Sequence, residues 1–497
     1  MDDEFTHNAD PLESRILAVP ESSSALEEID VKHQQLLQNQ QILYATSLIT
    51  QNSHTPVKVS NIIVQNAECV RPAVLQTYLD QTIGQATTFE ELCSQSDILN
   101  MKLISNGLVE NCTQTVDSRG VLHYSLKDAN FAPSYALPRG SNEAISVLDV
   151  VSIVNLQSLK KFTAKTGTNV GNGEGDGYLQ FQWRNALGGG ERFTFDATKG
   201  TKTHSSYLVD YTQPLSPWWL WDTSVYKNSR ALGNAELLLR GLRGSIKSSF
   251  EKHSNANHEL NFESVWRSTM ASTNHSSDTL LAHCGHDVKN SLGHSLFWDS
   301  RDKPIFPFSG SFVKVSNELA LGKFWKLTFE SSKVKSWLSN NFITASGTVK
   351  GGYIKNFNPK TQSIHVSDKF QSGGSNDVRS FQLMGLGPKD LHDSIGGDAF
   401  VSYGISVFSR LPINRWSDSN FRLHAFFNGG RLINSNGRPA DSLMRALSRE
   451  HSTSTGVGIV FGHPIARFEL NFTIPLSAHT SDSVRKGLQY GIGLSFL

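Results

Sequence analysis

The chain has 497 residues, which allows two or more domains, and its 46 Lys and Arg residues against 45 Asp and Glu residues give a net charge of +1. Because this balance comes without a run of Lys or Arg, we expect no nucleic-acid partner. The apolar runs fall short of the about 18 residues that a membrane-spanning helix needs. A mean hydropathy of −0.30 fits a transmembrane β-barrel as well as a soluble protein, because a barrel's apolar outer face alternates with a polar lumen face.

The first 55 residues are predicted to carry no cleavable targeting segment. Five acidic side chains fall within the first thirteen residues and no apolar stretch follows, unlike a transit peptide or a secretory signal. Any organelle address is therefore expected to be internal. After a polar tail, leucines recur at roughly helical spacing from Ser24 to Thr50, which indicates either an amphipathic helix that docks on a partner or a loose coil.

Residues 56–128 have the pattern of a small α+β domain. Thr88, followed by Glu91 three residues on, is a capping box for the second of two helices. Residues 129–158, which contain Pro133, Pro138 and Gly140, are predicted to be a linker. The elements expected in the small domain are strands at 57–65, 108–115 and 121–126 and helices at 71–82 and 88–106.

Residues 159–497 are predicted to be almost entirely strand. Roughly sixteen segments can be placed, many near the ~9–11 residues of a membrane-spanning strand, and the even number permits a closed antiparallel barrel. The segments lie near 160–171, 176–187, 190–199, 203–213, 218–228, 240–250, 257–269, 290–300, 310–320, 323–333, 341–354, 398–410, 420–429, 454–462, 464–476 and 487–497.

Alternation of apolar and polar residues is clearest late in the chain. Phe468, Leu470 and Phe472 share one face of a strand, whereas Glu469 and Asn471 share the other. A soluble β-sandwich would show the same alternation. The aromatic run from Trp218 to Trp221 fits an interfacial girdle of a barrel, although a buried corner of a core would also explain it.

The segment 358–397 is predicted to be a folded, inward-pointing loop rather than a linker. It is long and rich in glycine, and it carries apolar side chains that need a surface to pack on. The strand after it alternates cleanly, with Val401, Tyr403 and Ile405 on one face. The loop's candidate motif residues are Gly373, Gly374, Val378, Arg379, Ser380, Phe381, Gly387 and Pro388.

This motif closely resembles the inward-folded loop of the barrel-assembly superfamily of outer-membrane insertases. The usual motif there is Val/Ile-Arg-Gly-Phe/Tyr, and Ser380 stands where Gly is usual, although Ser adopts positive φ only at a cost. Within the superfamily, the chain is most similar to the family of central barrel subunits of the mitochondrial sorting and assembly machinery, from about Val57 to Leu497. The resemblance implies a barrel preceded by a polypeptide-transport-associated (POTRA) domain.

The resemblance also implies that Arg379 inserts into the lumen and pairs with a carboxylate. Related bacterial proteins carry a Phe-x-Asp-x-Gly pattern on a later strand, where this chain has Asn428 and Gly429. Asn428 can accept a hydrogen bond but cannot form an ion pair. Glu450 and Glu469 are therefore the candidate carboxylates.

Two strands are candidates for a lateral gate, as the resemblance implies. The first barrel strand should pair weakly because it carries few apolar residues, and its candidate residues are Phe162, Ala164, Lys165, Gly167, Asn169 and Val170. In the last strand, Leu488, Tyr490, Ile492, Leu494 and Phe496 are expected to face lipid. Gln489, Gly491, Leu494 and Phe496 also resemble the β-signal of mitochondrial barrels.

The sequence predicts neither covalent catalysis nor a cofactor. It has no nucleophile elbow, phosphate-binding loop or zinc-protease motif, and the four cysteines lack metal-ligand or redox spacing. His283, Cys284 and His286 lack further ligands at suitable spacing, so we predict no metal site.

The predicted function is an insertase of the mitochondrial outer membrane that templates client strands at a lateral gate. The resemblance implies an N-terminal domain in the intermembrane space and accessory subunits on the cytosolic side. It also implies clients such as the import-translocase channel and the voltage-dependent anion channel. The alternatives are a polypeptide-secreting outer-membrane transporter, a passive porin and a soluble β-rich binding protein.

Overall fold

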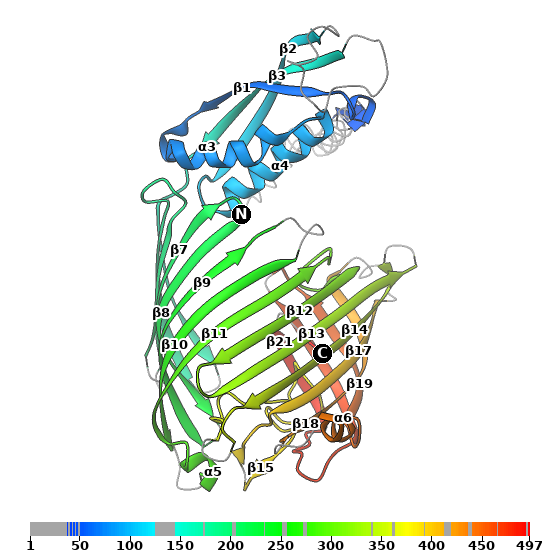
Figure 1. Ribbon diagram of the computed structural model, residues 1–497. Coiled ribbons are helices and arrows are strands. Elements are labelled where there is room, and N and C mark those ends of the chain that lie inside the picture. The colour runs from blue at the N-terminus through cyan, green and yellow to red at the C-terminus, as the bar shows by residue number, and fades with distance from the viewer. Residues whose placement is uncertain are drawn as a thin grey trace, which may run out of the picture. The chain divides into compact units, whose positions relative to one another are not determined.

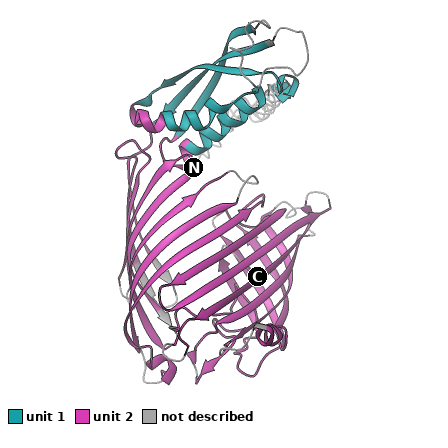
Figure 2. Ribbon diagram, viewed as in Figure 1, with its two compact units in different colours: residues 1–67, 76–102, 111–157 teal, residues 68–75, 103–110, 158–497 magenta. Residues whose placement is uncertain are grey.

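The fold is taken from a computed structural model (Figure 1). It divides into two compact units, shown in Figure 2: residues 1–67, 76–102 and 111–157, and residues 68–75, 103–110 and 158–497. The structure describes residues 37, 40, 41, 43, 44, 46, 47, 50–124, 145–171, 174–200, 205–232, 234–250, 256–271, 276–338, 341–359, 363–391, 393–411, 419–435, 440–464, 466–493, 496 and 497. The predicted tail and most of the predicted first helix lie outside these residues, and the described positions between 37 and 52 are helical.

The first unit contains a three-stranded sheet and parts of two helices. Its strands are β1 (Val57–Gln65), β2 (Asn111–Tyr124) and β3 (Ile145–Gln157), and the helices are α3 (Pro72–Gln81) and α4 (Phe89–Ser105). β3 lies in the middle, parallel to β1 and antiparallel to β2. Tyr78, Leu92 and Leu99 on the helices and Val150 and Val154 on β3 are almost completely buried, which makes this a small α+β domain. Thr88 Oγ1 caps α4 by accepting a hydrogen bond from the Glu91 N–H at 3.2 Å.

The range predicted to be a linker contains the central strand of this sheet. Residues 145–157 form β3, whereas the two strands predicted at 108–115 and 121–126 are one strand, β2, with an irregular register between Ser118 and Gly120. The proline and glycine residues that suggested a linker all precede β3. The apolar run that follows them is buried against both neighbouring strands, as expected of a central strand.

The second unit is dominated by an antiparallel sheet that contains, among the described residues, sixteen strands in chain order (Figure 1). All sixteen segments predicted from the sequence are strands. Their bounds are β4 (Phe162–Gly171), β5 (Glu174–Arg184), β6 (Arg192–Gly200), β7 (Ser206–Ser216), β8 (Trp219–Leu232), β9 (Ala235–Ser248), β10 (Asn257–Ala271), β11 (Gly285–Asp299), β12 (Gly310–Ala320), β13 (Phe324–Trp337), β14 (Ile343–Asn356), β17 (Ala399–Arg410), β18 (Phe421–Ile433), β19 (Ser452–Gly462), β20 (Arg467–Ser477) and β21 (Gly487–Gly493).

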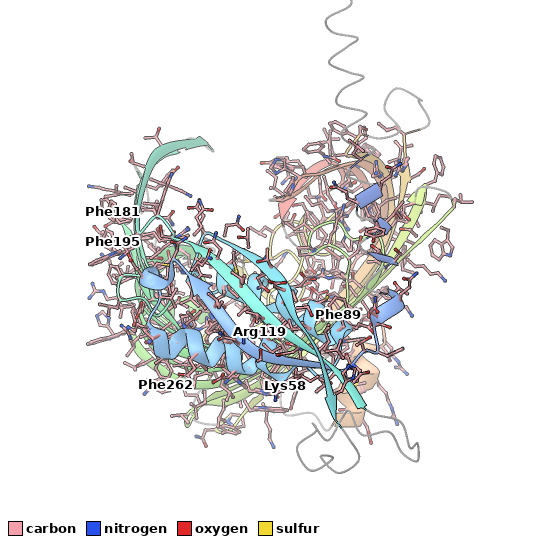
Figure 3. All side chains as sticks on the ribbon, turned by 90° about the horizontal axis from the view of Figure 1, so that it is seen from above. Lys58, Phe89, Arg119, Phe181, Phe195 and Phe262 are labelled. Atoms are coloured by element: carbon pink, nitrogen blue, oxygen red, sulfur yellow. The ribbon has the colours of Figure 1, made fainter. Side chains whose placement is uncertain are left out.

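The sheet curls into a barrel wall with an apolar outer face and a more polar inner face. On β17, Ser402 and Ser406 are buried on the inside, whereas Ile405 and Val407 on the opposite face are 57% and 40% exposed. Figure 3 shows Phe181, Phe195 and Phe262 on the outer face of the wall. An apolar outer face on membrane-length strands is the pattern of a transmembrane β-barrel. None of the described helices combines the length and apolar character that crossing a membrane requires.

Two strands form the edges of this sheet. β4 pairs with β5 and β21 pairs with β20, and within the described residues no β-pairing joins β4 to β21. In the part of the chain that the structure describes, the barrel is therefore not closed by a complete hydrogen-bond ladder.

Three connections carry further short elements. Helix α5 (Asp278–Leu281) precedes β11, and the small hairpin β15 (Lys389–Asp390) and β16 (Asp393–Ser394) precedes β17. Helix α6 (Ala440–Leu447) lies between β18 and β19.

Candidate functional site

The connection between β14 and β17 folds against the inner face of the barrel. Its apolar side chains Val378, Phe381 and Leu386 are at most 2% exposed and form a cluster with Leu497. The loop also joins the connection between β20 and β21, because the Gln382 N–H donates to the Ser483 carbonyl at 3.0 Å. The predicted inward loop is therefore a packed element that lies close to the end of the chain.

Arg379 is fully buried at the centre of this contact. Its Nη2 and Nε donate to Glu469 Oε2 at 2.9 and 3.2 Å, and its Nη1 donates to a main-chain oxygen of Leu497 at 3.1 Å. The guanidinium also lies over the ring of Phe426, 4.6 Å from its centroid. Of the two candidate carboxylates, the structure places Glu469 against Arg379. Glu450 is 70% exposed, pairs with Arg431 at 3.4 Å and has His479 Nε2 at 3.7 Å.

Glu469 also pairs with a second cation, Arg467, which is not among the site residues predicted from the sequence. Arg467, two residues before it on β20, forms an ion pair with the other oxygen of the same carboxylate. Asn471 donates to Glu469 Oε2 at 2.7 Å and its own side-chain oxygen lies 2.9 Å from His424 Nδ1. Because i, i+2 spacing on a strand puts residues on one face, the alternation of β20 contained the signal for this group.

The backbone after Arg379 has the conformation that usually requires glycine. Ser380 has φ = 69°, its N–H donates to Gln489 Oε1 at 3.0 Å, and its buried hydroxyl has no hydrogen-bond partner among the described residues. The motif glycines Gly373, Gly374 and Gly387 also have positive φ, at 105°, 124° and 92°. The carbonyl of Pro388 accepts a hydrogen bond from the Ile395 N–H at 3.3 Å.

The candidate docking residues on β18 separate onto two faces. Asn428 is fully buried on the inner face, where its Nδ2 donates to the Asp377 carbonyl at 3.2 Å and its Oδ1 accepts from Ser454 at 2.6 Å. The prediction for Gly429 is wrong, because this residue lies on the outer face beside Tyr403. Gly430 is the glycine that faces the loop: a Cβ there would lie 3.1 Å from a methyl group of Val378.

The last strand contacts the loop through its inner face. Gln489 binds Ser380, and the Asn376 side chain donates to the Ile492 carbonyl at 2.8 Å. A Cβ at Gly491 would lie 2.7 Å from the side-chain oxygen of Asn376, so a side chain there would disturb the loop. Leu488 and Ile492 are 65% and 56% exposed on the outer face, as predicted.

The prediction that Phe496 faces lipid is wrong. β21 ends at Gly493, and Phe496 is 7% exposed, with its ring centroid 4.7 Å from the guanidinium carbon of Arg467 and 5.8 Å from that of Arg379. A ring face against two buried cations is a favourable place for an aromatic side chain. Leu494, another β-signal candidate, lies outside the described residues.

The first barrel strand has little packing of its own. Phe162, Ala164 and Lys165 are exposed and Gly167 is half-buried. Asn169 and Val170 belong to the backbone ladder opposite Asp176 and Gly175. A strand with one paired edge and few buried side chains is expected to pair weakly.

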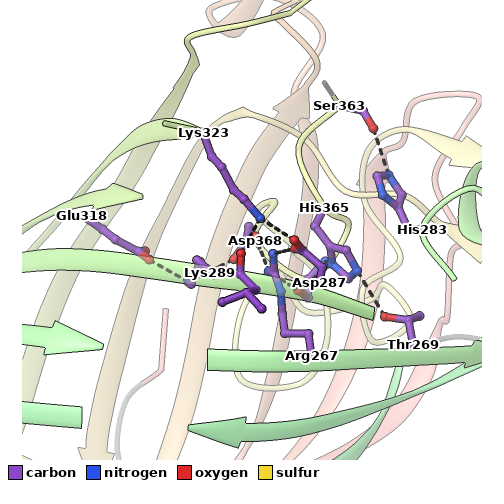
Figure 4. Close-up of polar contacts among 12 residues, drawn as sticks. Arg267, Thr269, His283, Asp287, Lys289, Glu318, Lys323, Ser363, His365 and Asp368 are labelled. Carbon is purple, nitrogen blue, oxygen red and sulfur yellow. Dashed lines mark hydrogen bonds and ion pairs between the residues drawn. The ribbon is translucent and has the colours of Figure 1, made fainter. Parts of the chain in front are cut away.

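The beginning of the loop has a second anchor, shown in Figure 4. Asp368 forms ion pairs with Arg267 on β10 and with Lys289 on β11, the latter at 3.1 Å, and its carbonyl accepts from Lys326 on β13 at 2.8 Å. Arg267 also pairs with Asp287 on β11. Burial raises the pKa of the Asp368 carboxyl, but Lys289 and Arg267 outweigh it and leave the pKa below its usual range.

A neutral histidine lies beside this ion-pair cluster. His365 is 7% exposed, its Nδ1 accepts from the Ser367 N–H at 3.2 Å, and its Nε2 lies 3.2 Å from Thr269 Oγ1. Burial, followed by the charge of Arg267, lowers the pKa of His365 to about 4. The described residues contain no group of three or more His, Cys, Asp or Glu placed to hold a metal ion.

Comparisons with known proteins agree with this architecture. Residues 185–496 match the Omp85 superfamily domain. The chain is 40% identical to the sorting assembly machinery 50 kDa subunit of Saccharomyces cerevisiae, over 89% of this chain and 94% of that protein. It is 32% identical to the human sorting and assembly machinery component 50 homologue, over 73% of this chain and 76% of that protein.

Among solved structures, BamA from Haemophilus ducreyi lacking POTRA domains 1–3 has the same fold. The TM-score is 0.63 at 14% identity, covering 88% of this chain and 84% of that one. The chain therefore belongs to the Omp85 superfamily and, within it, to the family of the 50 kDa subunit of the sorting and assembly machinery.

Proposed function

We propose that this chain is an insertase that folds β-barrel precursors and releases them into the mitochondrial outer membrane. The family supports barrel assembly as the activity, and the unpaired edges of β4 and β21 support a mechanism. An incoming strand carries N–H and C=O groups that cost several kcal/mol each when they enter hydrocarbon unpaired. A free edge strand satisfies those groups before the client strand meets lipid.

The observation that carries the proposal is the way the loop holds β21. Ser380 binds the side chain of Gln489, and Asn376 binds one main-chain group of the strand, the Ile492 carbonyl. These two contacts hold β21 in place, and within the described residues no strand pairs with its other edge. β4 is sparsely packed and pairs only with β5 among the described strands, so it is the edge strand that moves away from the wall most easily.

A passive porin is a weaker explanation of the same fold. A porin needs an open water-filled lumen, whereas here the loop of 358–397 is tied to the inner wall at both Asp368 and Arg379 by buried ion pairs. A polypeptide-secreting transporter of the same superfamily would use the lumen rather than the edges, so the two mechanisms predict different contacts with the transported chain.

We further propose that residues 56–157 form a receiving domain in the intermembrane space, and that accessory subunits bind the cytosolic side. Clients would include the import-translocase channel and the voltage-dependent anion channel. No covalent step or cofactor is involved, because strand pairing and lipid partitioning supply the driving force.

Disulfide trapping of an arrested client tests the mechanism. The four native cysteines are first replaced by serine, and Lys165→Cys on β4 and Leu488→Cys on β21 then report the two edges. Val225→Cys on β8, which is also exposed, is the control. A client with a cysteine in its terminal strand should cross-link to the edge positions in isolated mitochondria and leave Val225→Cys unlabelled. Cross-linking to a lumen-facing position such as Arg243→Cys, on the inner face of β9, would instead indicate secretion.

A further inference from the structure

A groove of about 830 Å³ lies on the outer wall of the barrel beside α6. Its lining is mostly apolar and includes Phe329 on β13, Gly351 and Tyr353 on β14, Val401 on β17, and Leu443 and Met444 of α6. These strand residues share one face, because Phe329 is opposite Gly351 and Gly351 is opposite Val401 in the ladders.

The burial pattern of β17 shows that this face is the outer one and that α6 covers part of it. Ser402 and Ser406 are buried on the inside, while Ile405 and Val407 are exposed on the outside. Val401 lies on the same outer face but is half-buried, at the level of α6. The helix therefore leans against the membrane-facing wall near the ends of the strands.

One residue that lines the groove, Gly351, contributes no side chain to it. Gly351 lies between two apolar neighbours, and a Cβ built there would meet only the carbonyl oxygen of Phe400, at the ordinary contact distance of 3.6 Å. The position has no positive φ and would accept a larger residue. Gly351 therefore leaves the neighbouring apolar surface uncovered, although a larger side chain would fit at this position.

Two positively charged side chains lie next to residues that line the apolar groove. Arg445 and Arg449 are exposed, directly follow the groove-lining residues Met444 and Ser448, and have no ion-pair partner among the described residues. The nearby Arg431 is bound to Glu450, at 3.4 Å. An apolar groove in the lipid-facing wall with free cations at its end suits a molecule with a hydrocarbon chain and an anionic headgroup.

We propose that this groove binds a phospholipid, with one acyl chain lying along Gly351 under α6 and an anionic headgroup at Arg445 and Arg449. The wall faces hydrocarbon, so a lipid chain is the material that fills the space. The headgroup cations add selectivity for anionic over zwitterionic lipid.

Photolabelling of the full chain in vesicles tests the site. The vesicles contain phosphatidylcholine with or without phosphatidylglycerol, and a trace of either lipid carries a photoactivatable acyl chain. Labelled peptides are identified by mass spectrometry. In the wild type, labelling by phosphatidylglycerol should concentrate on α6 and the outer face of β14 and β17.

Two pairs of variants separate the groove from the surrounding wall. Gly351→Leu fills the groove and should reduce labelling of α6 at least about threefold, whereas Gly347→Leu, on the same face of β14 with open space around its Cβ, should not. Neutralising Arg445→Gln and Arg449→Gln should each cut the preference for phosphatidylglycerol by about fivefold, as expected for a cation near an anionic surface.

The proposal fails if Gly351→Leu and Gly347→Leu are labelled alike. It also fails if α6 takes no label in the wild type, because that result would point to a protein segment as the occupant of the groove. Unchanged lipid preference in the arginine variants would remove the headgroup assignment. Because labelling needs no client, these outcomes are independent of the insertase proposal. The exposed arginines can be changed without disturbing the core, so a fold defect in one glycine variant leaves the test intact.

Discussion

At the scale of single residues, one buried carboxylate holds two buried guanidiniums. Glu469 pairs with Arg379 from the loop and with Arg467 from its own strand. Removing one cation leaves the carboxylate paired, but removing the charge of Glu469 leaves both cations without a counter-charge. Breaking a buried pair in that way typically costs ~3–5 kcal/mol.

We therefore expect Glu469→Gln to destabilise the barrel more than Arg379→Gln, by ~3–5 against ~1–3 kcal/mol. Guanidinium unfolding of the purified protein in detergent measures both. Glu450→Gln is the control, because that side chain is 70% exposed and its ion pairs should contribute less than ~1 kcal/mol. Equal stability of the Glu469 and Arg379 variants would show that Arg467 does not depend on this carboxylate.

Ser380 occupies a glycine conformation at an energetic cost. A positive φ costs a non-glycine residue about 1–3 kcal/mol, and the buried hydroxyl finds no partner within the described part of the chain. Ser380→Gly removes both costs and adds about 0.5–1 kcal/mol of unfolded-state entropy. We expect a net gain of ~1 kcal/mol in the free energy of unfolding, with Ser380→Val strongly destabilising. A less stable glycine variant would mean that the hydroxyl has a stabilising role.

Only part of this residue-level site could be predicted from the sequence. The motif singled out Arg379, and chemistry reduced its partners to Glu450 and Glu469. The choice between them depends on which strand lies beside the loop, which no local pattern encodes. Asp368 and Arg267 were missed for the same reason: about a hundred residues separate them, and neither stands in a motif.

At the scale of elements, the loop is clamped at two places on different arcs of the wall. Its beginning is tied to β10, β11 and β13 through Asp368, and its motif is tied to β18, β20 and β21 through Arg379, Asn428 and Ser380. The first clamp includes the neutral His365, and this makes it sensitive to pH.

The pH dependence has a defined sign. The pKa of His365 is about 4 in the folded chain and about 6.5 when unfolded, so only the unfolded chain gains a proton between these values. Above pH ~6.5, His365 is neutral in both states and does not lower the free energy of unfolding. As the pH drops towards 4, the free energy of unfolding falls by up to ~3 kcal/mol because only the unfolded chain binds the proton. Protease cleavage of the loop should increase over that range. His365→Gln, which cannot gain a charge, should remove most of the pH dependence, and an unchanged profile would assign it elsewhere.

Strands could be predicted from the sequence where the alternation of apolar and polar residues matches the burial of the two faces. Strands such as β13 and β20 follow from alternation, because each has one face in lipid and one inside, whereas β4 carries few apolar residues. β3 was missed because it is buried in the middle of its sheet and does not alternate. The inward position of Phe496 was missed because its contacts with Arg379 and Arg467 leave no trace in the alternation itself.

At the scale of the whole molecule, the last strand is defined by its two faces rather than by its apolar content. The inner face carries Gln489 and Gly491 against the loop, and the outer face carries Leu488 and Ile492 towards lipid. If the chain's own last strand is recognised during assembly, recognition should depend on the inner face, where specific groups are bound.

We expect Gln489→Ala with Gly491→Ala to block assembly of the chain into the membrane, while Leu488→Ala with Ile492→Ala is tolerated. The first pair leaves the buried Ser380 N–H without its acceptor, at ~1–3 kcal/mol, and pushes a methyl group to within 2.7 Å of Asn376. The second pair exchanges apolar side chains for smaller ones in a lipid environment, where no specific contact is lost. Import of radiolabelled variants into isolated mitochondria, followed by native gels, distinguishes them. Equal defects would mean that the strand is only a stabilising edge, because then each face would count by its packing alone.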